Sequence, residues 1–218
     1  MKRYLYTGIL VAVLLMMSSA SMAQIIPDWY GQPGTTYQRW TFDMELTEFI
    51  PPEETDNLVG MPEAFVSKDL FTEWINDPGI GSKTGVWSLG PEGKIDISVG
   101  YTPDTFSVQR EIWVEVDYLD GMMSFEPGVS VDGSTLISPA GYDLVEMDAS
   151  SGLVDTWMSG LYKFEQNLEL PFDSIQVTSD QMTGSVIDAL TVYTRPIPEP
   201  VSILLLSFGG LLARKRLA

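Results

Sequence analysis

Residues 111–118 read Glu111-Ile112-Trp113-Val114-Glu115-Val116-Asp117-Tyr118, in which apolar and polar side chains alternate with a period of two. On a strand, Ile112, Val114, Val116 and Tyr118 would share one face, opposite Glu111, Trp113, Glu115 and Asp117. Residues 94–99 repeat the pattern, with Ile95, Ile97 and Val99 opposite Lys94, Asp96 and Ser98. Both segments therefore predict half-buried β-strands.

Five further segments have strand-like patterns and are separated by turn-rich sequences such as Glu126-Pro127-Gly128 and Asp132-Gly133-Ser134. These predicted strands are residues 37–42, 142–147, 156–165, 172–178 and 185–194. One stretch, residues 63–74, predicts a helix instead, because Phe65, Leu70 and Trp74 fall roughly on one side. The sequence as a whole predicts an all-β fold, a β-sandwich of jelly-roll type.

The chain has 218 residues and contains no cysteine and no histidine. This composition excludes disulfides, thiolate nucleophiles, imidazole bases and the usual zinc or copper sites. A Ser-His-Asp triad is excluded for the same reason, since its base is missing. The six Trp, nine Tyr and nine Phe residues supply the material for a core that must hold without disulfides.

The segment between the two special termini is strongly acidic. Residues 24–196 contain 29 acidic and 7 basic residues. Such a surface repels the phosphate backbone, so nucleic acid is not an expected partner. Solubility and mutual repulsion at a cell surface are one interpretation of this charge, and binding of divalent cations is another.

The N-terminus has the layout of a secretory signal peptide. Lys2 and Arg3 precede an almost unbroken apolar run over residues 5–17, and Ser21-Met22-Ala23 forms a small-x-small cleavage site before Gln24. We therefore expect signal peptidase to cut between Ala23 and Gln24. The apolar run is too short for a comfortable membrane span, and no charged residues follow it to stop transfer.

The C-terminus has three parts in order. These are Pro198-Glu199-Pro200, an uncharged run over residues 201–213, and the basic cluster Arg214-Lys215-Arg216. The run would enter a membrane as a short helix with the bases on the cytoplasmic side. Thirteen residues reach only about 20 Å as a helix, short of the roughly 30 Å hydrocarbon layer, which suits a transient anchor better than a permanent one.

This tripartite tail resembles the PEP-CTERM sorting signal, and the resemblance covers about 22 residues. It implies recognition by an exosortase-type membrane protease at the surface of a Gram-negative, polysaccharide-producing bacterium, with cleavage near the motif. The residues that carry over are substrate features: Pro198, Glu199, Pro200, Arg214, Lys215 and Arg216. The implied location is the cell surface, the outer membrane or the extracellular matrix, after transient anchoring in the inner membrane.

These signals divide the chain into a signal peptide (residues 1–23), an extracytoplasmic domain (24–196) and a sorting tail (197–218). Residues 29–42 also resemble the mature N-terminus of PEP-CTERM proteins from planctomycete-type bacteria. Residues 187–194 resemble the final strand of such proteins, which leads directly into the tail. Both resemblances support a sandwich and imply no activity.

One constellation has an enzymatic character. Glu115-x-Asp117-x-x-Asp120 resembles the E-x-D-x-x-E strand of laminarinase-like glycoside hydrolases, which implies Glu115 as nucleophile and Asp120 as acid/base, about 5 to 5.5 Å apart. The last residue departs from that pattern, since Asp is one methylene shorter than Glu. The alternative is a strand with a solvated acidic face that ends in a turn.

The sequence also contains candidate residues for a calcium site and for a sugar-binding site. Calcium, the one cofactor considered, would use carboxylates near strand ends, namely Asp117, Asp120, Asp132, Asp143, Glu146 and Asp148, although no loop has EF-hand spacing. Sugars would stack on exposed aromatic rings, for which the candidates are Trp29, Tyr30, Trp87, Trp113 and Trp157. Of these Trp113 shares a face with Glu115 and Asp117, so it is either an exposed platform or sealed beneath a crossing loop.

Three functional hypotheses follow. The first is a noncatalytic surface or matrix protein, sorted through its tail and associated with exopolysaccharide. The second is a carbohydrate-active enzyme that uses Glu115 and Asp120. The third is a calcium-dependent adhesin.

Overall fold

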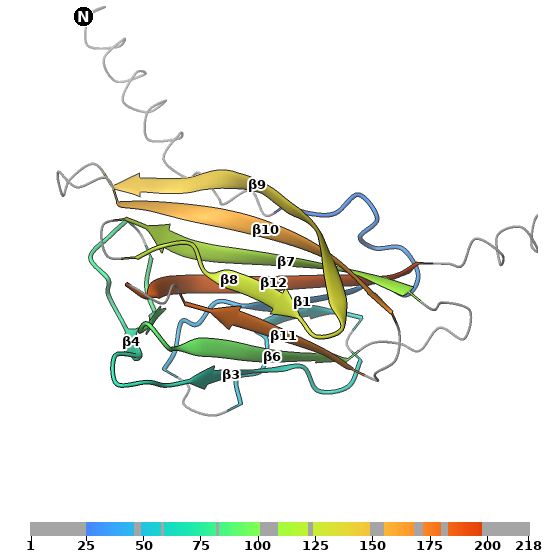
Figure 1. The fold of residues 1–218 in the computed structure, drawn as a ribbon, viewed down its shortest axis with the longest axis horizontal. Coiled ribbons are helices and arrows are strands. Elements are labelled where there is room, and N and C mark those ends of the chain that lie inside the picture. The colour runs from blue at the N-terminus through green and yellow to red at the C-terminus, as the bar shows by residue number, and fades with distance from the viewer. Residues whose placement is uncertain are drawn as a thin grey trace, which may run out of the picture.

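A computed structural model describes nine segments of the chain: residues 25–45, 49–57, 59–81, 83–100, 109–121, 124–148, 155–167, 172–179 and 183–197. For residues 138–148, 167 and 172 it describes the backbone alone. These segments form twelve strands and no helix. The strands build two antiparallel sheets that face each other as a β-sandwich, as predicted (Figure 1).

The larger sheet contains eight strands, in the order β2-β1-β12-β7-β10-β9. Strand β5 also pairs with β12, and β4 pairs with β5. The bounds are β1 (Thr36–Trp40), β2 (Glu54–Asp56), β4 (Glu73–Ile75), β5 (Val86–Leu89), β7 (Gln109–Asp120), β9 (Ser134–Asp148), β10 (Asp155–Asn167) and β12 (Ser185–Ile197). The central strands β7 and β12 pair from Ile197↔Gln109 to Val186↔Leu119.

The smaller sheet contains four strands, in the order β3-β6-β11-β8. Their bounds are β3 (Glu63–Ser67), β6 (Lys94–Gly100), β8 (Gly128–Val131) and β11 (Phe172–Thr178). From β5 to β9 the chain changes sheet at every connection, and it changes sheet again on entering and leaving β11. Segments far apart in sequence are therefore neighbours in both layers.

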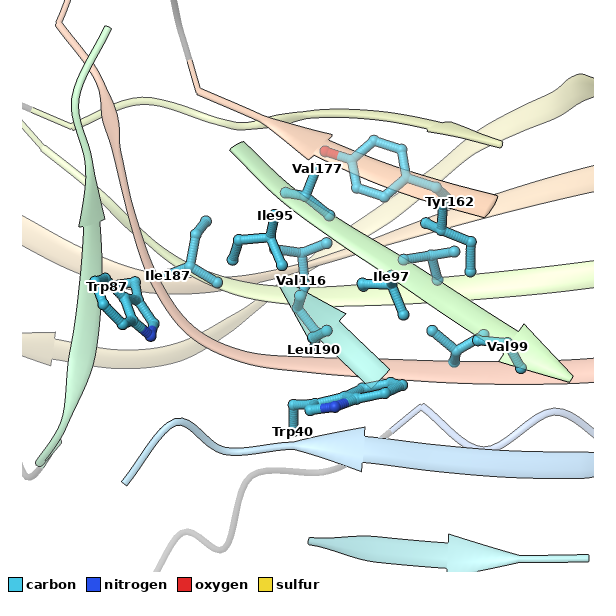
Figure 2. Packing of buried hydrophobic residues seen from close by; sticks show 14 of the residues in the cluster. Trp40, Trp87, Ile95, Ile97, Val99, Val116, Tyr162, Val177, Ile187 and Leu190 are labelled. Atoms are coloured by element: carbon cyan, nitrogen blue, oxygen red, sulfur yellow. The ribbon is translucent and has the colours of Figure 1, made fainter. Parts of the chain in front are cut away.

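The core lies between the sheets and follows the period-two pattern of the sequence. Ile112, Val114 and Val116 of β7 are fully buried, as are Ile95 and Val99 of β6. Figure 2 shows Val116 and Leu190 from the larger sheet near Ile95, Ile97 and Val177 from the smaller one, with Trp40 and Trp87 at the sides. The predicted inward faces of residues 94–99 and 111–118 are thus confirmed.

The predicted strands are also confirmed at the level of the backbone. Residues 172–178 match β11 at both ends, and the remaining six lie within or overlap β1, β6, β7, β9, β10 and β12. Several strands run longer than predicted. Strand β9 reaches fifteen residues because its pairing with β10 continues through three register shifts.

The predicted helix over residues 63–74 is wrong. Residues 63–67 form β3, in which Ala64 and Val66 point into the core with period two, and residues 73–75 form β4. Between them Asp69 builds a tight turn, its carboxylate accepting hydrogen bonds from the Phe71 amide and the Thr72 hydroxyl. Leu70 is 96% exposed at this turn. Phe65, Leu70 and Trp74 therefore do not share one buried face, as a helix would require.

A buried ion pair joins the two sheets. Arg110 on β7 and Asp173 on β11 both point into the core, where Arg110 Nη1 donates to Asp173 Oδ2. Their side chains are 3% and 0% exposed. Burial raises the pKa of Asp173 to about 6, although the Arg110 charge acts to lower it. Such a pair is costly to break because the remaining charge stays buried.

We expect Asp173→Ala to lower the free energy of unfolding by about 3 to 5 kcal/mol, since it removes the carboxylate that pairs with the buried charge of Arg110. Glu45→Ala is the matched control, because Glu45 pairs with Lys68 at 3.7 Å on the surface and should contribute less than about 1 kcal/mol. Urea unfolding at neutral pH measures both. Equal losses for the two variants would contradict the structural role of the inter-sheet pair.

Candidate functional site

The outer face of the larger sheet carries the carboxylates that the sequence singled out. Glu115 and Asp117 leave β7 on the side away from the smaller sheet, yet they are only 4% and 7% exposed. The expected solvated acidic face is therefore wrong. Two segments cover it: residues 25–35, which precede β1, and residues 76–85, which connect β4 to β5.

Two donors hold Glu115, one from the neighbouring strand β10 and one from the segment before β1. The Ser159 hydroxyl on β10 donates to Glu115 Oε1 at 2.8 Å, and the Ile25 amide donates to the same oxygen at 3.3 Å. The other oxygen, Oε2, is buried and has no hydrogen-bond partner among the described residues. Burial raises the pKa of Glu115 to about 7, and the nearby Asp117 charge adds to the effect.

A further carboxylate, that of Asp188, comes from β12. A register shift between Ile187 and Ala189 leaves Asp188 as the extra residue of a β-bulge next to Asp117. Lys83 Nζ lies 2.5 Å from Asp188 Oδ2, and the two side chains are 11% and 10% exposed. Burial raises the pKa of Asp188 to about 6, partly offset by the Lys83 charge.

Two cations, Lys83 and Arg39, lie near these acidic side chains. Burial raises the pKa of Asp117, while the charges of Lys83 and Arg39 act to lower it. Arg39 lies on β1, two strands from β7, and is half-buried. We name Glu115, Asp117, Asp188, Lys83 and Arg39 the buried charge cluster.

Aromatic side chains close one end of this cluster. Trp29 lies edge-on to Trp113 at 5.6 Å between ring centroids, and the Lys163 ammonium lies 3.7 Å from the centre of the Trp113 ring. The Trp113 indole donates to Glu111 Oε1, and Glu111 also pairs with Arg195. Trp113 is therefore covered on its ring face, which favours the sealed arrangement over an open sugar platform.

The other aromatic candidates are mostly core residues. Trp29, Trp87 and Trp157 are at most 1% exposed. The Trp157 indole donates to the Ile80 carbonyl at 3.1 Å and so ties residues 76–85 to β10. Tyr30 is half-buried, and its hydroxyl donates to Asp56.

The structure does not bring Asp120 beside Glu115. The two residues are five apart on β7, whose pairing with β10 has no register shift, so their side chains leave opposite faces of the strand. Glu115 is buried, whereas Asp120 is exposed at the end of β7. The close carboxylate pair that the resemblance to glycoside hydrolases implies is absent from this strand.

The calcium candidates are likewise separated. Asp132 lies in the turn before β9, and its carbonyl accepts from Gln166, which stands opposite Arg110 near the beginning of β7. Asp117 and Asp120 lie toward the other end of that strand. Among the residues that the structure describes, no three acidic side chains gather in a metal-binding arrangement. Asp143, Glu146 and Asp148 are on β9, where only the backbone is described.

The processing signals lie outside the described residues. This holds for Ala23 and Gln24, for Pro198, Glu199 and Pro200, and for Arg214, Lys215 and Arg216. In the part of the chain that is described, there is no helix of the length and apolarity needed to cross a membrane.

Comparison with known proteins adds no family. No protein-family model matches the chain. No curated protein matches it either.

Sequence analysis missed Lys83, Asp188 and Ser159. One signal was present, because Asp188 interrupts the apolar run Val186-Ile187-Asp188-Ala189-Leu190 in a predicted strand. A charge at such a position calls for a buried partner. No local pattern indicates which residue that partner would be, since Lys83 is 105 positions away.

We expect Glu115→Gln to stabilise the protein above pH 7. The folded pKa of about 7 exceeds the usual 4.5, so the stabilisation from protonated Glu115 is complete below pH 4.5 and is lost as pH rises through 7. At about 1.4 kcal/mol for each pH unit in that window, the loss is at most about 3.5 kcal/mol. Urea unfolding from pH 5 to pH 8 should show a smaller decline for the variant than for the unaltered chain.

Glu165→Gln is the control for this titration, because Glu165 lies on β10 and its side chain is exposed. It should leave the unfolding free energy close to that of the unaltered chain at each pH. A decline in Glu115→Gln as steep as in the unaltered chain would contradict the titration of Glu115 in the folded state.

Proposed function

We propose that this chain is an exported, noncatalytic protein of the cell surface or extracellular matrix, sorted through its PEP-CTERM-like tail. Signal peptidase would remove residues 1–23, and an exosortase-type protease would act on the tail around Pro198-Glu199-Pro200. The chain would pass through the inner membrane and remain there only transiently. The mature unit would be the β-sandwich.

The observation that carries this proposal is where the packed unit begins and ends. Ile25, two residues after the predicted signal cleavage, already donates its amide to the buried Glu115. At the other end β12 pairs with β7 up to Ile197↔Gln109, immediately before Pro198. The folded unit thus fills the interval between the two predicted processing signals, which is what a domain flanked by removable segments requires.

The environment of the acidic residues supports a noncatalytic role. A general acid or nucleophile must reach its substrate. Glu115 and Asp117 are instead covered by residues 25–35 and 76–85 and are bound within the protein. Glu115 in particular holds a covering segment against the sheet, because it accepts a hydrogen bond from the Ile25 amide.

The strand order supports the finer assignment to the jelly-roll class. Strand β12 lies between β1 and β7, and β11 lies between β6 and β8. The chain passes from one sheet to the other at eight of the eleven connections between the described strands, as expected for the double Greek key of a jelly roll. Strand β9 departs from that scheme, since it pairs with β10 in the larger sheet.

Association with exopolysaccharide is the extracellular role that we propose for the mature unit, on the basis of the resemblance of its tail. The purified domain should be retained by the host polysaccharide without release of new reducing ends. Release of reducing ends that is abolished in Glu115→Gln would favour the enzyme instead. A melting temperature that falls on addition of a chelator would favour the calcium-dependent adhesin.

The sorting proposal predicts that Pro198→Ala combined with Pro200→Ala abolishes tail processing in the bacterium that makes the chain. Without the two prolines, the backbone is no longer restricted to the extended conformation that the protease would recognise. The larger, unprocessed chain should remain with the inner membrane, as measured by immunoblotting of cell fractions. A matched control changes Pro33 and Pro51, two exposed prolines of the domain, to Ala. A product of unchanged size and location in the Pro198/Pro200 variant would contradict the proposal.

A further inference from the structure

Lys83 and Asp188 meet in surroundings that differ from those of an ordinary surface ion pair. Lys83 Nζ lies 2.5 Å from Asp188 Oδ2, so the amine contacts an oxygen that is bonded directly to the carboxyl carbon. Both side chains are about nine-tenths buried. The apolar side chains of Val86, Leu119 and Trp157 form a buried group near them, and the Lys83 ammonium lies 5.7 Å from the centre of the Trp157 ring.

The backbone on each side holds the two residues in place. Asp188 occupies the bulge of β12, which is paired with β7 on both sides of the register shift. Lys83 lies between β4 and β5, in a loop whose two ends are joined by a hydrogen bond. The Gly85 amide donates to the Asn76 carbonyl at 2.9 Å. Gly85 has φ +77°, and a Cβ there would lie 2.8 Å from the Phe42 carbonyl oxygen, so only glycine fits this closure.

A third group stands beside the pair. Asp117 faces Ala189 in the register, next to the bulge, and its carboxyl interacts electrostatically with both Lys83 and Asp188. The other charged groups that act on these acids are Glu115 on the same strand, Arg39 on β1 and Asp43 after β1. Asp117 is 7% exposed, so all three groups lie away from bulk water.

We propose that Lys83 and Asp188 become joined by an intramolecular amide bond, with Asp117 as the proton-transfer group. The reaction begins with transfer of a proton across the contact from the Lys83 ammonium to the Asp188 carboxylate, which gives the neutral amine and neutral acid that amide formation needs. Burial also favours the protonated form of Asp188. The contact between the Lys83 amine and the Asp188 carboxyl group replaces the encounter that a reaction between free molecules would need.

The bond changes balance without any further reagent. Lys83 Nζ attacks Cγ of Asp188, so that a C–N bond forms. The C–O bond to the acid hydroxyl then breaks. Asp117 takes one proton from Nζ and delivers it to the departing hydroxyl, which leaves as one molecule of water. The product is a neutral amide that links residues 76–85 to β12 and removes two charges from the buried charge cluster.

The test is a tryptic map of the full chain, isolated from cells and analysed by mass spectrometry. An amide at Lys83 prevents cleavage after that residue. The linked species should therefore join peptide 69–94 to the peptide that begins at Phe164 and continues past the uncut Arg195–Pro196 bond, and it should weigh one water less than their sum. Complete cleavage after Lys83 with no linked species would overturn the proposal and leave an ion pair only.

Two variants test whether the amide bond forms at Lys83. Lys83→Arg keeps the positive charge and cannot form the amide, so the linked species should disappear. Lys94→Arg is the matched control, because Lys94 also pairs with an aspartate, Asp96, at 3.0 Å but is 39% exposed. It should retain the link between Lys83 and Asp188 in full. A linked species that persists in Lys83→Arg would overturn the assignment.

The role of Asp117 has its own measurement. In Asp117→Asn the linked fraction, sampled at intervals after synthesis begins, should accumulate about 100-fold more slowly or not at all, as expected for loss of a general acid–base group. Circular dichroism confirms that the variant folds. Linkage at the unaltered rate would overturn the role of Asp117.

Discussion

Strands β7 and β12 are buried on both faces, and most other features of this protein depend on that constraint. On the inner side Val116 and Leu190 pack against the smaller sheet and are fully buried. On the outer side residues 25–35 and 76–85 lie over the same two strands. Any polar side chain on the outer face therefore loses most of its hydration, and it must find a partner or take its neutral form.

The buried charge cluster shows how that requirement is met. Ser159 and the Ile25 amide bind Glu115, while Lys83 binds Asp188. These contacts each join a covering segment or a neighbouring strand to the centre of the sheet, as the Arg110–Asp173 pair joins the two sheets on the inner side. Buried polar groups of this kind contribute less to net stability than an apolar replacement would, but they fix one arrangement of the segments that they connect.

Residue type and residue environment lead to different functional conclusions here. A glutamate and two aspartates close together on one strand have the composition of a glycosidase motif. Their chemistry depends on access and on the face from which each one projects, and Glu115 is covered while Asp120 projects from the other face. Glu115 is instead bound by groups of the protein itself. The last strand, which leads toward the predicted sorting tail, is held from both sides.

Local sequence patterns were enough to predict seven of the twelve strands and the inward faces of residues 94–99 and 111–118. The two terminal signals are predictions from local patterns of the same kind. Period-two alternation identifies the apolar face of residues 111–118 regardless of what the rest of the chain does. The tertiary structure alone decided what covers the opposite face. It also decided that residues 63–74 are strand and turn, since the pairing of β3 with β6 overrides a weak local preference. The meeting of Lys83 with Asp188, 105 residues apart, depends on the bulge in β12 and the path of residues 76–85, and neither is visible in a local pattern.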